Sequence, residues 1–173
     1  MKEGAMRRLF VMRHAKSSWA DDGLDDHSRP LNERGTRDAP RVAQELVARG
    51  YIPQVILSSD SIRTRHTLAG MTAILQAPRL TQIAYDHSLY HGGFEQLGEL
   101  LEIIPDEVSE LLVLGHNPGW EEVVELCAGE YVQMTTANVV VLEKPAARGV
   151  SWAAALAEYN SWRIVDVLRP KEL

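Results

Sequence analysis

The sequence predicts an α/β fold, a three-layer α/β/α sandwich in which a mostly parallel sheet lies between helices. Short apolar runs of strand length occur at residues 9–12, 54–58 and 111–114. Such runs are typical of strands that are buried on both faces of a parallel sheet. The second and third runs lead through a turn into a segment with helical features, and units of this kind build the three layers.

The length and charge of the chain limit its organisation and its partners. At 173 residues it is long enough to bury a full core, and we expect one domain over residues 1–173. It carries 18 basic and 24 acidic residues, a net charge of −6, which argues against non-specific attraction to nucleic acid or anionic membranes. We therefore expect no nucleic acid and no membrane among its partners.

Signals of cellular compartment indicate the cytoplasm. The single Cys127 excludes an internal disulfide framework and fits a reducing compartment. The basic segment 1–8 is followed by an apolar run that is too short for a signal peptide, and no stretch of the sequence approaches a membrane span. We expect a cytoplasmic protein.

The first predicted strand ends in Arg13 and His14. Open α/β sheets place their ligand crevices at the carboxyl ends of strands, so both side chains are expected in a site. Arginine offers a rigid fork of donors for phosphate oxygens, and neutral imidazole is a nucleophile near neutral pH. The pair indicates phosphoryl chemistry, whereas the alternative for these two residues alone is a surface ion pair and a structural histidine.

An acidic segment and a helix follow. The carboxylates of residues 21–27 lack the ligand spacing of a calcium loop, so we expect a solvated loop and no metal there. Asn32 or Thr36 is the expected cap of a helix that Gly50 closes. Pro40 is expected in the first turn of this helix or at a kink.

The second strand, residues 54–58, runs into capping residues and a helix that is expected to continue through Leu75. The free amides at a helix N-terminus favour anions. Arg63 lies in the first turn of this helix and is expected to face the same crevice as Arg13. One of Arg63 and Arg65 is expected on a solvated face.

A third strand is expected at residues 80–85, followed by a loop at 86–93 whose paired glycines indicate mobility or close packing. The amphipathic helix that begins at Phe94 is expected to include Ile104 and to end at Pro105. Its expected role is packing in the core.

The strand at 111–114 repeats the opening pattern, because a small residue and His116 follow it. His116 is therefore expected at the same crevice. Pro118 can start the next helix, whose apolar face comprises Trp120, Val123, Val124 and Cys127.

Two late strands are expected at residues 137–143 and 161–168, joined by an exposed hairpin loop that contains Pro145 and Gly149. Three aromatic residues are expected to pack at the far side of the sheet: Trp152, Tyr159 and Trp162.

Three motifs have the order, spacing and strand context of a known family: Arg13-His14-Ala15, Ser59-x-x-x-Arg63-x-x-x-Thr67 and Gly115-His116-Asn117-Pro118. With them the chain resembles the histidine phosphatase superfamily, in particular its small branch, the phosphohistidine phosphatases of the SixA type. Two further stretches look like signatures of that branch, residues 13–19 and Asp26-x-x-Arg29-Pro30-Leu31-Asn32-x-x-Gly35. The resemblance runs from about Leu9 to Val124 and implies a phosphoglycerate mutase-like form of the predicted fold.

The resemblance implies a role for each matched residue. His14 is the expected nucleophile, and the expected catalytic residues are His14, Arg13, Arg63 and His116. The expected substrate-binding residues are Arg13, Ala15, Ser17, Arg63, His116 and Asn117. Because fixed cationic donors can stabilise the charge on the phosphoryl oxygens, no metal ion and no cofactor are expected.

The chain departs from the superfamily's mutases. They carry a glutamate proton donor near the place of Leu89-Tyr90-His91 and an asparagine at the place of Ala20. Mutase activity is therefore not expected. The proton donor for the leaving group stays open among Asp86, His91 and Glu95.

The expected function is a metal-independent phosphatase that removes phosphate from phosphohistidine in proteins. Two alternatives stay open: a small-molecule phosphomonoesterase that uses the same residues, and a phosphate-binding adaptor without turnover, which the retained nucleophile and arginines disfavour. Large members of the superfamily insert a helical lid before the late histidine, where this chain holds about one strand and one helix. An open site that admits a protein segment is therefore expected, with a phosphorylated protein or a small phosphorylated substrate as partner.

Overall fold

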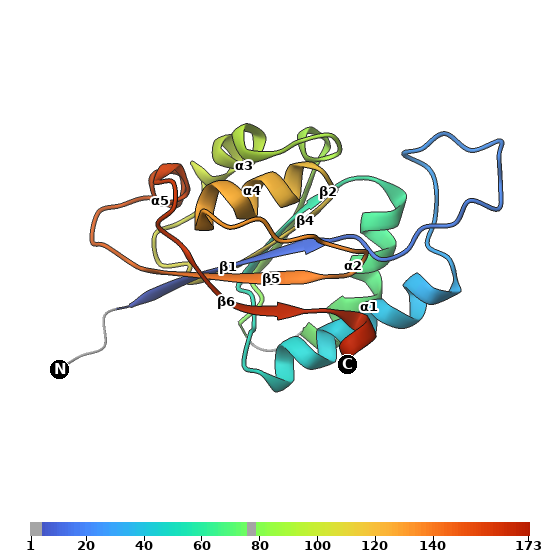
Figure 1. Ribbon diagram of the computed structural model, residues 1–173, viewed down its shortest axis with the longest axis horizontal. Helices are drawn as coiled ribbons and strands as arrows, with labels where there is room; N and C mark the ends of the chain where they lie inside the picture. Colours follow the sequence, from blue (N-terminus) through green and yellow to red (C-terminus); the bar gives the residue numbers. More distant parts are fainter. Residues whose placement is uncertain (1–4, 76–78) are drawn as a thin grey trace.

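Figure 1 shows a computed structural model of the protein, which describes residues 5–75 and 79–173. The strands are β1 (Met6–Arg13), β2 (Val55–Ser59), β3 (Gln82–Asp86), β4 (Glu110–Gly115), β5 (Val139–Pro145) and β6 (Arg163–Leu168). The α-helices are α1 (Glu33–Ala48), α2 (Ile62–Leu75), α3 (Phe94–Leu101), α4 (Gly119–Ala128) and α5 (Trp152–Ala157). Two 3₁₀ turns are η1 (His87–Leu89) and η2 (Pro170–Glu172). The first four residues of the basic N-terminal segment lie outside the described residues.

The strands form a six-stranded sheet in the order β3-β2-β4-β1-β5-β6. Strands β1 to β4 pair in parallel, whereas β5 runs antiparallel to both of its neighbours, β1 and β6. Parallel neighbours need long crossover connections, which the helices supply here. The predicted mostly parallel sheet is confirmed.

Helices cover both faces of the sheet, which confirms the predicted three layers. Figure 1 shows α1 and α2 on one side and α3, α4 and α5 on the other. Successive side chains of a strand alternate between faces, so Leu9 and Val11 of β1 enter one core and Phe10 and Met12 enter the other. All four side chains are fully buried. This burial on both faces explains why the strand is continuously apolar.

The parallel strands bring three of the predicted site segments to one edge of the sheet. β1 ends at Arg13, β2 at Ser59 and β4 at Gly115, and Arg13 lies opposite Gly115 in the register. His14, the start of α2 and His116 therefore leave the sheet at the same edge, as predicted for a ligand crevice.

The predicted hairpin loop between β5 and β6 is wrong, although the two strands are antiparallel neighbours. The connection contains helix α5, which Ser151 caps by accepting a hydrogen bond from the amide of Ala154. Trp152 is fully buried, and its indole donates to the carbonyl of Val108. The segment folds back because burial of this large ring removes much apolar surface from water.

Two predictions about individual residues differ from the structure. Pro40 is the eighth residue of α1, which excludes the first-turn position and leaves the kink as the remaining alternative. Gly70 of α2 packs against this part of α1, and a Cβ at Gly70 would lie 3.3 Å from that of Ala39. The strand expected from Ala137 begins at Val139, because Ala137 has a left-handed φ of 62°. The alternative caps of α1 are resolved in favour of Asn32, which accepts from the amide of Gly35.

Two further differences concern apolar residues. α3 ends at Leu101, and Ile104, which the sequence predicts inside this helix, is buried beyond its end. Trp152 and Trp162 pack in the core as predicted, but Tyr159 is 59% exposed and lies edge-on against Phe94.

No helix of the described residues is long and apolar enough to cross a membrane.

Candidate active site

The backbone fixes His14 where β1 ends. Its amide donates to the carbonyl of Gly115 in β4 at 3.0 Å, and its carbonyl accepts from the amide of Ala137 at 3.0 Å. The residue is only 7% exposed. The imidazole therefore projects from a rigid element, as a precisely positioned reactive group requires.

Six of the seven predicted site residues line one cavity of about 210 Å³, which we call the phosphate cavity. They are Arg13, His14, Ser17, Arg63, His116 and Asn117. Ala15 is fully buried next to them, and its amide donates to the hydroxyl of Thr67 at 3.0 Å. The structure thus brings together residues from the three motifs.

The hydrogen bonding of His14 selects its reactive nitrogen. Nδ1 lies 2.7 Å from the carbonyl oxygen of Ala15. A carbonyl can only accept, so Nδ1 carries the proton and the neutral ring has its lone pair on Nε2. Burial, partly offset by this hydrogen bond, and the charges of nearby arginines lower the pKa of His14 to about 3. At neutral pH the ring is therefore uncharged and nucleophilic at Nε2.

His116 faces His14 across the cavity, with 5.1 Å between the ring centroids. Its Nδ1 lies 3.3 Å from Nη2 of Arg63, which can only donate. The ring proton is consequently on Nε2, which donates to the hydroxyl of Ser59 at 2.8 Å. Burial, the adjacent His14 ring and the charge of Arg63 lower the pKa of His116 to about 2.

Asp26 holds the buried guanidinium of Arg63 in place. Arg63 donates to the backbone carbonyl of Asp26 and, at 3.0 Å, to its carboxylate. The same carboxylate accepts from the Tyr90 hydroxyl and from Arg29. Burial raises the pKa of the Asp26 carboxyl, but these hydrogen bonds and the arginine charge outweigh it and hold that pKa well below its usual range.

Four residues that line the cavity are not among the predicted site residues: Lys16, Trp19, Arg29 and Thr136. Arg29 is only 7% exposed, donates to the Ser17 hydroxyl at 2.9 Å and stacks on Trp19 with 3.5 Å from its Cζ to the ring centroid. The stretch Asp26-x-x-Arg29 is the available signal, because it resembles a signature of the branch, although the resemblance assigned no role to either residue.

Arg13 and Asn117 meet at one backbone oxygen. Both side chains donate to the carbonyl of Met134 at 2.8 Å. Within residues 5–75 and 79–173, the buried Nε atoms of Arg13 and Arg63 and Oδ1 of Asn117 have no hydrogen-bond partner. The guanidinium groups of Arg13 and Arg63 therefore keep unused donors, the kind of partner that an anionic ligand needs.

The candidate proton donors lie to one side of the phosphate cavity. His91 and Glu95 line a neighbouring hollow of about 440 Å³, together with Tyr90 and His116. The carboxylate of Asp86 is used as a cap, because it accepts from the first turn of η1. Tyr90 stands edge-on to the His116 ring, at 5.5 Å between centroids, but its hydroxyl is bound to Asp26.

The arrangement suits phosphoryl transfer. Cationic side chains surround a neutral imidazole whose Nε2 lone pair is free. These side chains are held in position before a ligand binds. Fixed donors of this kind stabilise the charge that spreads over the equatorial oxygens of a transferring phosphoryl group. A second imidazole, His116, lies within reach of the same volume.

Comparisons with known proteins agree with this chemistry. The sequence matches the model of the histidine phosphatase superfamily (branch 1) over residues 9–107. An uncharacterized chloroplastic protein of Arabidopsis thaliana is 38% identical over 95% of this chain and 78% of its own length.

Solved structures show the same fold. A protein from Agrobacterium tumefaciens described as a phosphohistidine phosphatase, SixA, has a TM-score of 0.78 and 29% identity, covering 95% of this chain and 98% of that one. A mycobacterial glucosyl-3-phosphoglycerate phosphatase has a TM-score of 0.61 and 17% identity, covering 92% and 97% of the two chains. At 17% identity, the likeness to the mycobacterial phosphatase shows only a shared fold.

Proposed function

The chain belongs to the histidine phosphatase superfamily, and on that premise we propose that it is a phosphatase that forms a covalent phosphohistidine on His14. This chemistry needs no metal ion, and the substrate is phosphohistidine in proteins. The observation that carries the proposal is the free Nε2 of a neutral His14 in a cavity lined by Arg13, Arg29 and Arg63.

The proposed reaction consists of two displacements at phosphorus. First, the lone pair of His14 Nε2 attacks, and the bond from phosphorus to the leaving nitrogen or oxygen breaks with its electron pair, which then takes up a proton. Second, a water molecule attacks the phosphoenzyme, and the bond from phosphorus to Nε2 breaks. The electron pair of that bond returns to the ring, and phosphate leaves with the protons of the water. The arginines hold the phosphoryl oxygens in both steps.

His116 supports these steps through a change in protonation. In the free protein its Nδ1 accepts from Arg63, so it offers no proton to a ligand at that atom. A bound phosphoryl dianion places negative charge beside the ring and raises the pKa of His116. The protonated ring then donates from Nδ1 to a phosphoryl oxygen.

The leaving group explains the proposed preference for phosphohistidine. An alkyl phosphate departs as a strongly basic alkoxide and needs a general acid, which typically contributes ~10²–10⁴-fold in rate. The hydroxyl of Tyr90 is bound to Asp26, and the carboxylate of Asp86 caps η1. The other two candidates, His91 and Glu95, line the neighbouring hollow and not the phosphate cavity. Phosphohistidine departs as imidazole, a much weaker base, so this site can cleave it with little help.

The surroundings of the phosphate cavity support a protein substrate. The neighbouring hollow of about 440 Å³ shares His116 and Asn117 with it, and another of about 390 Å³ shares Arg13 and Lys16. Helix α1 supplies three arginines to the second hollow, Arg34, Arg37 and Arg41, and one carboxylate, Asp38, which pairs with all three. The hollow keeps an excess of positive charge. A protein segment can therefore extend from the cavity into either hollow, with acidic groups placed against α1.

A side-by-side assay tests the substrate. With excess EDTA, kcat/KM should be at least about 10²-fold higher for a phosphohistidine peptide than for a sugar phosphate, and His14→Ala should abolish both activities. Comparable efficiency on the sugar phosphate would favour the small-molecule phosphomonoesterase. Phosphate binding without turnover of any substrate would favour the adaptor.

A further inference from the structure

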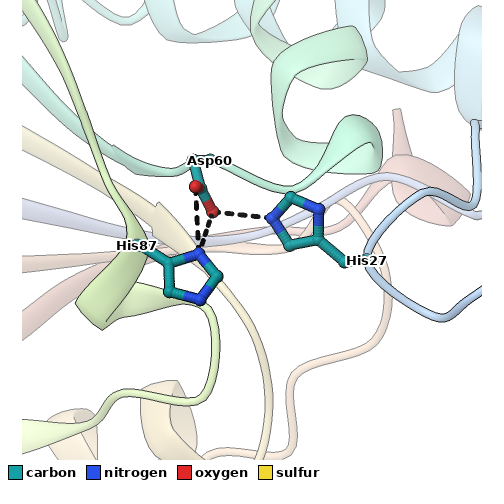
Figure 2. Close-up of side chains that lie close together, drawn as sticks. All are labelled: His27, Asp60 and His87. Atoms are coloured by element: carbon teal, nitrogen blue, oxygen red, sulfur yellow. Dashed lines mark hydrogen bonds and ion pairs between the residues drawn. The ribbon is translucent and has the colours of Figure 1, made fainter.

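Three metal-ligating side chains converge outside the phosphate cavity. Figure 2 shows the carboxylate of Asp60 between the imidazoles of His27 and His87. Nε2 of His27 lies 2.8 Å from Oδ1 of Asp60, and Nδ1 of His87 lies 3.0 Å from both carboxylate oxygens. One ligand atom from each residue lies within 4.8 Å of the other two.

These residues come from three segments that are distant in the sequence. His27 ends the acidic loop before α1, Asp60 lies in the turn between β2 and α2, and His87 opens η1 after β3. In the sequence, only the acidic loop at residues 21–27 suggests a metal site, and its ligand spacing excludes calcium. The cluster exists because parallel β2 and β3 end side by side, with Ser59 opposite Asp86 in the register.

We propose that His27, Asp60 and His87 form a binding site for Zn²⁺ at the rim of the phosphate cavity. Two imidazole nitrogens and one carboxylate oxygen, with water in an open fourth position, are a set that zinc accepts. Nitrogen donors disfavour Mg²⁺ and Ca²⁺, which prefer oxygen ligands.

The observed distances suit the insertion of such an ion. Zinc binds these ligand atoms at about 2.0–2.2 Å in a tetrahedron, which separates them by roughly 3.3 Å. The two His–Asp spacings of 2.8 and 3.0 Å need to widen by a few tenths of an ångström. The two imidazole nitrogens, which lie within 4.8 Å of each other, need to adopt the same separation. The His87 side chain is 72% exposed and that of Asp60 is 24% exposed, so an ion and its water can enter from solvent.

Proton balance is simple. Without metal, His27 Nε2–H and His87 Nδ1–H donate to Asp60. A bound Zn²⁺ takes the place of these two hydrogens. In each neutral ring the proton moves to the other nitrogen, so the rings release none. The nearby charges are mixed, because Asp26 and Asp86 flank the two histidines in the chain, whereas Arg65 donates to the backbone carbonyl of Asp60.

The site would stabilise the rim rather than take part in phosphoryl transfer. Asp60 adjoins Ser59, whose hydroxyl accepts from His116, and His27 adjoins Asp26, which holds Arg63. The Tyr90 ring lies 4.8 Å from that of His27 and 5.5 Å from that of His116. An ion that joins the three segments therefore fixes the residues that position the cavity wall, without touching a phosphoryl group in it.

Isothermal titration of the metal-stripped full chain with ZnCl₂ tests the site, with MgCl₂ as a second probe. We expect one saturable site for Zn²⁺, no comparable site for Mg²⁺, and loss of at least about tenfold in affinity in His87→Ala and in Asp60→Asn. His66→Ala is the matched control, because it removes an exposed histidine from α2 and should leave zinc affinity unchanged. Zinc at about 100-fold above Kd should raise Tm by roughly 5–10 °C in the wild-type chain.

The result that would overturn the site is an absence of saturable zinc binding, or binding that His87→Ala and Asp60→Asn do not weaken. Either outcome would leave a hydrogen-bonded His-Asp-His cluster only. The test does not depend on turnover, so its failure is distinct from a failure of the proposed phosphatase function.

Discussion

At the scale of single residues, the buried guanidinium of Arg63 links the elements of the site. It contacts Asp26 from the acidic loop and His116 from the end of β4, and it lines the phosphate cavity. Its position is fixed before any ligand binds, so the protein does not have to reorganise charge during the reaction.

Replacement of Arg63 should weaken ligand binding and slow phosphoryl transfer. We expect Arg63→Ala to lower kcat/KM by about 10²–10³-fold, measured on an aryl phosphate. Arg65→Ala is a matched control, because Arg65 is exposed on the same helix and stacks on Tyr85, and it should change kcat/KM by less than about twofold. Equal losses in the two variants would contradict the assignment of Arg63.

The low pKa of His14 predicts a dependence of stability on pH. Its ordinary value of 6.5 falls to about 3 in the folded protein, so between these values the unfolded chain binds a proton that the folded protein does not. Above about pH 6.5 the proton has no effect on the free energy of unfolding. As the pH falls from 6.5 toward 3, the free energy of unfolding falls by up to about 1.4 kcal/mol per pH unit for this one proton.

Urea unfolding at several pH values between about 4.5 and 7 measures this effect. The free energy of unfolding should fall less steeply with decreasing pH in His14→Ala than in the wild-type chain. Parallel slopes for the two proteins would show that His14 titrates alike in the folded and unfolded states.

Single residues were predictable where a motif named them. Arg13, His14, Arg63 and His116 each follow a strand or open a helix in a recognisable pattern, and all four line the cavity. Asp26 and Arg29 lie in a stretch that resembles a signature of the branch, but the resemblance assigned no role to them. The role of Asp26 depends on contacts with positions 63 and 90, which sequence spacing does not reveal.

At the scale of secondary-structure elements, α5 is the main departure from the sequence prediction. It has six residues, too few for a clear helical repeat, and the turn-forming residues Pro145 and Gly149 before it favoured a loop. Its place in the structure depends on tertiary burial of Trp152 rather than on local propensity.

The buried ring should therefore contribute strongly to stability. We expect Trp152→Ala to reduce the free energy of unfolding by about 3–5 kcal/mol, measured by urea denaturation. Tyr159→Ala, which truncates an aromatic side chain that is 59% exposed, should cost less than about 1 kcal/mol. A small effect of Trp152→Ala would restore the interpretation of this segment as an exposed loop.

The arginines of α1 predict a preference for acidic substrates. Arg37 is well exposed in the basic hollow beside the cavity, so Arg37→Glu should lower kcat/KM about 5- to 20-fold for an acidic phosphohistidine peptide, by loss of charge attraction. An aryl phosphate, which has no acidic groups to place against α1, should be cleaved as by the wild-type chain.

The control for this variant makes the same change of charge elsewhere. Arg148 is exposed in the connection after β5, at the end of the sheet opposite His14, because Pro145 lies beside Met6 in the register. Arg148→Glu should leave both activities unchanged. A similar loss with Arg148→Glu would show that net charge, rather than the hollow, controls binding.

At the scale of the whole molecule, the sequence predicted the architecture correctly because two kinds of signal agreed. Continuous apolar runs indicated parallel strands, and motifs at the ends of those runs indicated one edge of the sheet. The phosphoglycerate mutase-like α/β fold is confirmed by the structure and its relatives. The His27-Asp60-His87 cluster was not predictable, because only the adjacency of folded strand ends brings it together.

The central claim is that His14 carries the phosphoryl group. The most direct test is to quench turnover of a ³²P-labelled phosphohistidine peptide in excess EDTA and to locate the label by mass spectrometry after mild alkaline work-up. We predict an acid-labile, alkali-stable phosphoenzyme on His14 that does not form in His14→Ala. Label on another residue, or turnover by His14→Ala at the wild-type rate, would contradict the account.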